Sequence, residues 1–478
     1  MRRRQYLVLC GLVPLIIGCS PGGPDAPASD TIQPGVASAG APGAGDPAYP
    51  NDGNGGYDAL GYDVSITYDP PAQRLDGDTT VTAKATQDLN RFNLDLRGLD
   101  VASVEVDGQQ AEFTRESDFE LVITPAQTLA TGRTFKTRVR YSGVPGTGEE
   151  GLGAGGWHPS PSGGAYVVGQ PHSAAYWYPV NETPRDKATF RVTARVPEGW
   201  SVVSGGVEEQ TATADGWTTS TWRDDTPVAS YLTTVAIDRF TFERSTLPDG
   251  KPLVNAYAPG AEEQRSVAAR TAEAVEFLAS RFGPYPQTAT GGIYTDDRIG
   301  YSLETQGRPT YANWADLETV VHELAHQWYG NSVSVRDWSD VCLNECVASY
   351  SQWLWAEAKE GADLDEQYHS TLDRTRESTR LWSAKLHEAT AGAEFDGVYD
   401  KGILAMHALR RTIGDEPFAA ALKEWPALHK DGNATWREFE AFIAEKAGRT
   451  DLAPFFDAWF RGTTLPDDEH LYPGSLRR

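Results

Sequence analysis

One stretch of the sequence, residues 322–346, restricts the possible folds more than any other: HELAHQWYGNSVSVRDWSDVCLNEC. His322 and His326 are four residues apart, so on a helix both side chains project from the same face. Glu345 follows His326 after eighteen residues, at the start of a second apolar helical pattern from Val347 to Trp355. The stretch therefore predicts two helices packed against each other, with three metal-ligating side chains between them.

These three side chains have the chemistry of a zinc site. Two imidazoles and one carboxylate suit Zn²⁺ and leave a fourth position for water. We expect one Zn²⁺ per chain, bound by His322, His326 and Glu345. Glu323 lies beside the first His on the side of the helix that faces this water, which predicts a general base. Because zinc lowers the pKa of its water toward about 7, the four residues predict hydrolysis of an amide.

Two cysteines, Cys342 and Cys346, stand on either side of Glu345. On a regular helix their spacing puts the Cα atoms near the upper limit for a disulfide, with Cβ directions that fit poorly. We therefore expect two buried thiols that act as small apolar packing groups. The alternatives are a strained disulfide and a thiolate that competes for zinc.

The N-terminus, MRRRQYLVLCGLVPLIIGC, combines three Arg with an apolar run too short to span a bilayer. It predicts an export signal over residues 1–18. The end of the run resembles the lipobox of bacterial lipoproteins, which implies that Cys19 is acylated and becomes the first mature residue. A plain secretory signal is the alternative. We therefore expect an exported protein, lipid-anchored to a membrane at the bacterial cell surface or in the periplasm.

The composition of residues 19–56 and the charge of the chain without residues 1–18 each support a prediction. Residues 19–56 are rich in Gly, Pro, Ala, Ser and Asp and predict a disordered tether between the lipid and the folded domains. Removing residues 1–18 takes away three of the 42 basic residues and no acidic one, so 39 basic residues stand against 67 acidic ones. This acidic surface argues against nucleic acid as a partner.

The first folded part of the chain shows the periodicity of β-strands. Val64, Ile66 and Tyr68 alternate with other residues, and similar short strands broken by turn signals follow. We expect residues 57–246 to form a mostly antiparallel β domain, with a first turn at Asp76-Gly77.

Helical spacing dominates the remainder and predicts an α+β fold. The catalytic part is expected over residues 247–465, with a first long helix that stops at Gly283 and a capping box formed by Thr435 and Glu438. Residues 466–478 are expected to be a C-terminal tail.

With these motifs the chain resembles the aminopeptidase N family of zinc metallopeptidases, which is peptidase family M1 of gluzincin type. The family signature is H-E-x-x-H, eighteen residues, then E within a W-x-D-x-W-L-N-E-G-like segment, which here runs from Trp338 to Cys346. The resemblance implies an N-terminal β domain followed by a mostly helical, thermolysin-like zinc peptidase domain, in a short bacterial lipoprotein form. It also implies that the substrates are peptides or polypeptides with a free N-terminus, hydrolysed at the first peptide bond.

The resemblance adds three site residues. Glu304, in IGYSLETQ, matches the Glu of the family's G-A-M-E-N motif, which binds the free α-amine of the substrate. Gln170 matches the position at which the family has a Glu or Gln that contacts the same amine. Tyr399, in VYDKG, matches the Tyr whose hydroxyl stabilises the tetrahedral intermediate. A carboxylate and an amide can hold an ammonium by charge-assisted hydrogen bonds at a fixed distance from zinc, which selects the first peptide bond.

The chain also departs from the family pattern. Tyr301, Leu303 and Thr305 stand where the family has Gly, Met and Asn. Because the Gly normally lets the backbone approach the substrate, we expect Tyr301 to bind substrate and to narrow or reshape the pocket for the first side chain. The chain stops after what resembles the catalytic domain, without the family's C-terminal helical domain, so a more open cleft is expected.

Two other functions use the same residues differently. A thermolysin-like zinc endopeptidase shares the metal site but needs no amine anchor, so Glu304 and Gln170 favour an aminopeptidase over it. A cell-surface peptide-binding protein without catalysis is disfavoured because the predicted ligands, base and Tyr399 are all present.

Overall fold

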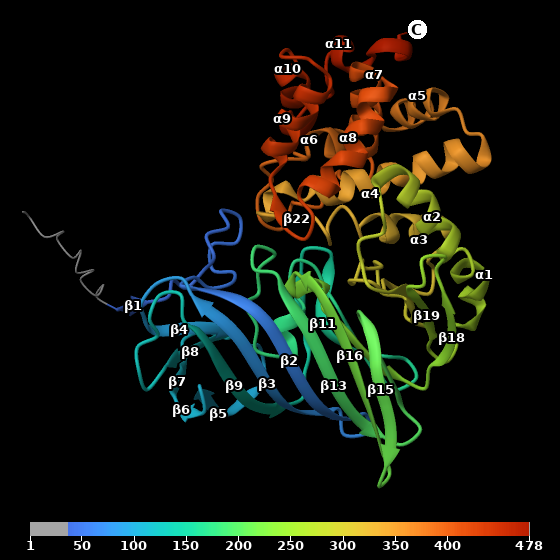
Figure 1. The fold of residues 1–478 in the computed structure, drawn as a ribbon. Helices are drawn as coiled ribbons and strands as arrows, with labels where there is room; N and C mark the ends of the chain where they lie inside the picture. The colour runs from blue at the N-terminus through green and yellow to red at the C-terminus, as the bar shows by residue number, and fades with distance from the viewer. Residues whose placement is uncertain (1–36, 478) are drawn as a thin grey trace, which may run out of the picture. The chain divides into compact units, whose positions relative to one another are not determined.

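The computed structural model describes residues 37–477. The predicted signal peptide and the predicted lipidation site, Cys19, lie outside the described residues. In Figure 1 the strands of the first half of the chain, blue to green, precede the helices of the second half, yellow to red. The predicted α+β fold is confirmed.

The largest sheet has eight strands in the order β15-β16-β13-β2-β3-β9-β5-β6. Buried and exposed residues alternate along β2, as its period-two sequence predicts. β13 pairs with β2 in parallel, and every other neighbouring pair in this sheet is antiparallel. The strands are β2 (Tyr57–Asp69), β3 (Arg74–Ala85), β5 (Asp100–Val106), β6 (Gln109–Gln110), β9 (Thr134–Gly143), β13 (Ala188–Pro197), β15 (Val207–Ala214) and β16 (Trp217–Val228).

Two smaller sheets complete the first half. A five-stranded sheet contains β10 (Thr147–Glu150), β11 (Gly153–Pro159), β12 (Ala165–Val168), β17 (Val235–Asp238) and β14 (Ser201–Ser204). A four-stranded sheet contains β1 (Ser38–Ala39), β4 (Leu89–Asp95), β8 (Glu120–Thr124) and β7 (Glu112–Arg115).

The second half begins with a sheet of β18 (Thr241–Thr246), β19 (Pro252–Tyr257), β20 (Thr290–Tyr294) and β21 (Thr310–Tyr311), and is otherwise helical apart from the short pair β22 (Ser334–Val335) and β23 (Asn433–Ala434). The helices are α1 (Arg265–Ala268), α2 (Thr271–Phe282), α3 (Leu317–Ala325), α4 (Cys342–Trp355), α5 (Leu364–Thr375), α6 (Thr379–Ser383), α7 (Lys401–Ile413), α8 (Asp415–Leu428), α9 (Trp436–Lys446), α10 (Ala453–Phe456) and α11 (Asp468–Leu471).

Two predicted helix ends are confirmed. α2 ends immediately before Gly283, whose φ of 95° is left-handed and suits glycine. Thr435 and Glu438 form the reciprocal capping box at the start of α9. Within residues 37–477, no helix has both the length and the apolar character needed to cross a membrane.

The first hairpin turns earlier than predicted. The turn between β2 and β3 lies at residues 70–73, which contain two prolines and Gln73 with a φ of 52°. Gly77 lies inside β3, where a Cβ atom would come within 2.2 Å of the Tyr141 ring. This glycine therefore permits a close approach between strands, and the predicted turn at Asp76-Gly77 is wrong.

Residues 37–56 are ordered, so the predicted tether is wrong for this part. β1 pairs with β4 in parallel, and the buried side chain of Asp46 accepts a hydrogen bond from the backbone N–H of Trp338 at 2.8 Å. Such partners lie far along the chain, so a prediction from local composition could not include them. We call residues 44–54 the strap.

Candidate metal centre and substrate cleft

Two packed helices carry the metal-ligating side chains. Asp316 caps α3, since its side chain accepts from the backbone N–H of Thr319 at 2.9 Å. His322 lies in α3 and His326 directly follows its last residue. α4 packs against α3 and holds Glu345 in its first turn. The predicted pair of helices thus brings the three side chains together.

The three ligand atoms have the spacing of a tetrahedral zinc site. The Nε2 atoms of His322 and His326 are 3.1 Å apart, and Oε2 of Glu345 lies 3.3 Å from the first and 3.4 Å from the second. Zinc bonds of about 2.0–2.1 Å in tetrahedral geometry place ligand atoms about 3.3 Å apart. Oε2 of Glu345 is buried and accepts no hydrogen bond. These residues therefore fit one Zn²⁺.

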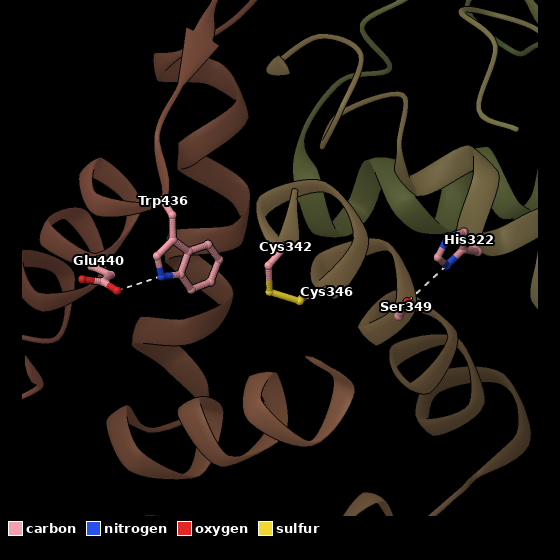
Figure 2. Close-up of a disulfide and its surroundings, with 6 residues drawn as sticks. All are labelled: His322, Cys342, Cys346, Ser349, Trp436 and Glu440. Carbon is pink, nitrogen blue, oxygen red and sulfur yellow. Dashed lines mark hydrogen bonds between the residues drawn. A yellow bond between two sulfur atoms is a disulfide. The ribbon is translucent and has the colours of Figure 1, made fainter. Parts of the chain in front are cut away.

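Neighbouring groups orient the two imidazoles. Nδ1 of His326 is 3.0 Å from the carbonyl oxygen of Tyr329, and Nδ1 of His322 is 3.5 Å from the hydroxyl of Ser349 (Figure 2). Both contacts leave the Nε2 atoms facing the ligand position. Burial would raise the pKa of Glu345, but the adjacent imidazoles of His326 and His322 lower it to about 2, so this carboxylate is charged.

Glu323 and Tyr399 face the same cavity, which has a volume of about 470 Å³. Glu323 is buried on α3, and this burial raises its pKa well above the usual range. The Tyr399 ring centroid is 5.9 Å from that of His322. Tyr399 lies two residues before the first residue of α7, Lys401, whose buried side chain donates to the carbonyl of Ala384 at 2.6 Å and so fixes the start of the helix.

The two predicted amine-binding residues are buried beside the metal ligands. Oε1 of Glu304 accepts a hydrogen bond from the Tyr231 hydroxyl at 3.2 Å, and burial raises the pKa of Glu304. Gln170 is 0% exposed, yet neither polar atom of its side-chain amide has a hydrogen-bond partner. An unpartnered buried amide that lines a cavity is suited to a polar ligand.

The structure brings every predicted site residue of the described part into one cavity: His322, His326, Glu345, Glu323, Tyr399, Glu304, Gln170 and Tyr301. The Tyr301 hydroxyl donates to the carbonyl of Ala154 at 2.6 Å, and this hydrogen bond holds the Tyr301 side chain against the hairpin formed by β10 and β11. Leu152 on this hairpin, Trp314 and Thr319 also line the cavity but were not predicted. Trp314 is 50% exposed, and an aromatic residue just before a helix cap was the only sequence signal for it.

Cys342 and Cys346 form a disulfide, so the prediction of two free thiols is wrong (Figure 2). Their Cα atoms are 4.8 Å apart, inside the usual range of about 4.4–6.8 Å. The prediction assumed a regular helix, in which the Cα atoms of residues four apart lie near the upper limit of this range, but Cys342 is the first residue of α4 and the two Cα atoms are closer than that. Gly402 of α7 packs against the disulfide, since a Cβ there would lie 2.6 Å from Sγ of Cys346.

Comparisons with known protein families cover both halves of the chain. The Peptidase M1 N-terminal domain matches residues 59–232, and the Peptidase family M1 domain matches residues 302–459. The glutamyl aminopeptidase of Rattus norvegicus is 27% identical over 318 residues, which are 61% of this chain and 33% of the relative. The aminopeptidase N of Lactococcus lactis subsp. lactis is 26% identical over 329 residues, covering 62% and 38%. The chain thus spans about a third of the length of these curated relatives.

Solved structures match this chain over a larger share of its length and of their own length. The M1 zinc metallopeptidase from Deinococcus radiodurans has a TM-score of 0.82 and 28% identity, covering 89% of this chain and 98% of that protein. A mutant of that enzyme has been solved with a Tyr-Ser-Ala substrate, again with a TM-score of 0.82, 28% identity and coverage of 89% and 99%. Mutants of a two-domain M1 zinc metallopeptidase, matched at 28% identity, have been solved with L-arginine (TM-score 0.78, covering 85% and 94%) and with L-tryptophan (TM-score 0.82, covering 89% and 99%).

Proposed function

The chain belongs to peptidase family M1, and from this premise we propose that it is a zinc-dependent aminopeptidase that hydrolyses the first peptide bond of peptides with a free N-terminus. One observation supports an aminopeptidase specifically, in addition to the family membership. Gln170, a buried amide without partners, and Glu304, a buried carboxylate, line the same cavity as the three metal ligands. An endopeptidase does not need this pair, because it does not have to bind the α-amine of its substrate.

Bound by His322, His326 and Glu345, zinc supplies a Lewis acid that polarises the scissile carbonyl and acidifies water. Glu323 accepts the proton of the attacking water and passes it to the leaving amine. Burial raises the pKa of Glu323, which favours the transfer of a proton to its carboxylate. The Tyr399 hydroxyl donates a hydrogen bond to the developing oxyanion.

The amine anchor defines the bond that is cut. Glu304 and Gln170 accept hydrogen bonds from the substrate ammonium, and the carboxylate supplies the opposite charge. With the ammonium held there, only the carbonyl of the first residue reaches the metal ligands and Glu323.

The charge of the cavity affects which side chain the N-terminal residue of a substrate can carry. Among the described residues that line it, Glu304, Glu323 and Glu345 are acidic and none is Lys or Arg. Tyr301, Leu152 and Trp314 supply apolar surface. We therefore propose that apolar, aromatic and basic first residues are accepted and that acidic ones are disfavoured. Arginine and tryptophan bound to the two-domain metallopeptidase mutants support this assignment.

The test is an assay of aminoacyl p-nitroanilides with metal-free protein, zinc-reloaded protein and Glu323→Gln. We expect metal removal to abolish turnover and zinc to restore it, and Glu323→Gln to lower kcat by about 10²–10⁴-fold while zinc remains bound. The glutamyl compound should have a kcat/KM at least about 10-fold below that of the leucyl compound, because a charged hydrogen-bond partner is missing for its carboxylate. Turnover unaffected in Glu323→Gln would reject the mechanism, and equal hydrolysis of N-acetylated peptides would favour the endopeptidase.

We also propose that the protein is exported and anchored through acylated Cys19. The short apolar run that ends in Ile17-Gly18-Cys19 supports this proposal. Cys19→Ala should move the protein from the membrane fraction to the soluble fraction of cells. Membrane association that survives this substitution would reject the lipid anchor.

A further inference from the structure

A buried charged triad lies two residues beyond Gln170. Nδ1 of His172 is 2.5 Å from Oε2 of Glu150, and its Nε2 is 2.5 Å from Oδ2 of Asp52. The side chains of His172, Glu150 and Asp52 are only 6%, 7% and 11% exposed. Burial alone would lower the pKa of His172, but the two carboxylates raise it to about 10, so the imidazole is charged at neutral pH.

The triad joins three segments around the amine anchor. Asp52 belongs to the strap, and Glu150 ends β10, in the hairpin that carries Leu152. The backbone N–H of Leu152 donates to the carbonyl of Gln170 at 3.2 Å. One cation, His172, therefore holds both the strap and the hairpin against the segment that carries Gln170.

The strap also contacts the loop that leads to Tyr399. The Tyr49 hydroxyl donates to the carboxylate of Glu394, which lies five residues before Tyr399. The Tyr49 ring also contacts His172 edge-on, with 5.5 Å between ring centroids. The strap thus connects the segment of the amine anchor with the loop that leads to Tyr399.

These contacts matter because Gln170 has no side-chain hydrogen bond that could orient its amide. Its direction depends on its backbone and on the packing around it. A buried ion network gives little net stability, since the desolvation of its charges offsets their attraction, but it defines one geometry. We propose that Asp52, His172 and Glu150 are positioning residues that hold the amide of Gln170 toward the α-amine of the substrate. The inference rests on the proposed function, which assigns the amine to this amide.

The kinetic test uses Asp52→Asn, which keeps the shape of the side chain but removes one charge, and His172→Gln. For leucine p-nitroanilide we expect KM to rise about 10-fold with kcat unchanged within about 2-fold, because a charge-assisted hydrogen bond made throughout the reaction is weakened. In a Gln170→Ala background the same substitutions should change KM by less than about 2-fold, because the residue they position is absent.

A matched control separates positioning from stability. His407 is another buried histidine, which contacts the Tyr350 hydroxyl and the Asp365 carboxylate at 2.9 Å each and does not line the cavity. His407→Gln and His172→Gln should both lower the melting temperature, but His407→Gln should leave KM unchanged. KM effects that add fully to those of Gln170→Ala, or that occur equally in His407→Gln, would overturn the proposal.

A second measurement does not depend on turnover. Hydrogen exchange of the full zinc-loaded chain should be faster in Asp52→Asn than in wild type over residues 150–156 and 168–176, with no change in α3. Hydrogen exchange can be measured even if the wild-type protein does not hydrolyse p-nitroanilides. Failure of the positioning role can therefore be distinguished from failure of the proposed aminopeptidase function. Unchanged exchange over residues 168–176 in a folded Asp52→Asn chain would show that the triad does not position Gln170.

Discussion

Replacing Glu304 by Gln removes the one negative charge assigned to the substrate amine and little else. The side chain is 2% exposed, and its Oε1 accepts from Tyr231, a hydrogen bond that the Gln oxygen can also accept. The backbone carbonyl of Glu304 accepts from Asn331 at 2.7 Å, so the chain path is held independently of the side chain. The substitution therefore tests charge rather than shape.

The magnitude follows from the environment of the carboxylate. Opposite charges roughly 3 Å apart attract by about 5 kcal/mol at an effective dielectric constant near 20, which is an upper limit. The Gln oxygen still accepts a hydrogen bond from the ammonium, so the substitution removes only the charge of the acceptor, and the charge of one partner strengthens a hydrogen bond by about 1–2 kcal/mol. With part of the Coulomb attraction added, Glu304→Gln should cost about 2–3 kcal/mol, or roughly 30- to 150-fold in kcat/KM.

The assay compares leucine p-nitroanilide with its analogue that lacks the α-amine. Wild type should prefer the amine-bearing compound, and Glu304→Gln should lose most of this preference while hydrolysing the analogue at the wild-type rate. Asn331→Ala, which removes the side-chain contacts to the backbone carbonyl of Glu304 and to Gln327 but leaves the carboxylate in place, serves as the control. An equal loss on both compounds would refute the reasoning, because Glu304 would then act on catalysis generally.

Three further predictions concern other parts of the molecule. Tyr399→Phe should lower kcat about 10²-fold with little change in KM, measured with leucine p-nitroanilide, because it removes one oxyanion donor; a change confined to KM would contradict this role. Replacing both Cys342 and Cys346 by Ser should destabilise the protein by about 2 kcal/mol, or about 2 °C in calorimetry, since the closed loop is short. Thiol titration of the unfolded, non-reduced protein should find both cysteines oxidised, and two free thiols would exclude the disulfide. Burial raises the pKa of Glu120 to about 7, so the folded state binds its proton more tightly than the unfolded state and wild-type stability falls as pH rises from about 4.5 to 7. Glu120→Gln should therefore equal wild type in denaturant titrations below pH 4 and exceed it by up to about 3 kcal/mol at pH 8, and equal stability at both pH values would refute the shift.

The metal ligands could be located from the sequence because helix geometry is local. The four-residue spacing of His322 and His326 forces their side chains onto one face, and the apolar pattern after Glu345 indicates the second helix. Gln170 and Tyr399 are different, since nothing in their own neighbourhoods places them at the metal site. They were proposed through the family resemblance, and the fold brings both to the cavity.

Two of the three errors, those on the strap and on Gly77, have a physical origin in contacts between distant segments, whereas the error on the disulfide is local. The strap is poor in apolar residues, so composition predicted disorder, but its order comes from partners such as Trp338 and Glu394. The disulfide was disfavoured because α4 was treated as regular from its first residue. Gly77 was interpreted as a turn residue, although it is needed for close packing against Tyr141.

The strap also sets an order of events when the protein is made. The hydroxyl of Tyr49 and its partner Glu394 are 345 residues apart. At synthesis rates of about 5–20 residues per second, the partner follows roughly 20–70 s after Tyr49. Most of the β domain can pair its strands in that interval, but the strap cannot complete its contacts. Completion of the cleft is therefore a late folding step, and a chain interrupted before residue 394 would leave the strap exposed to proteases.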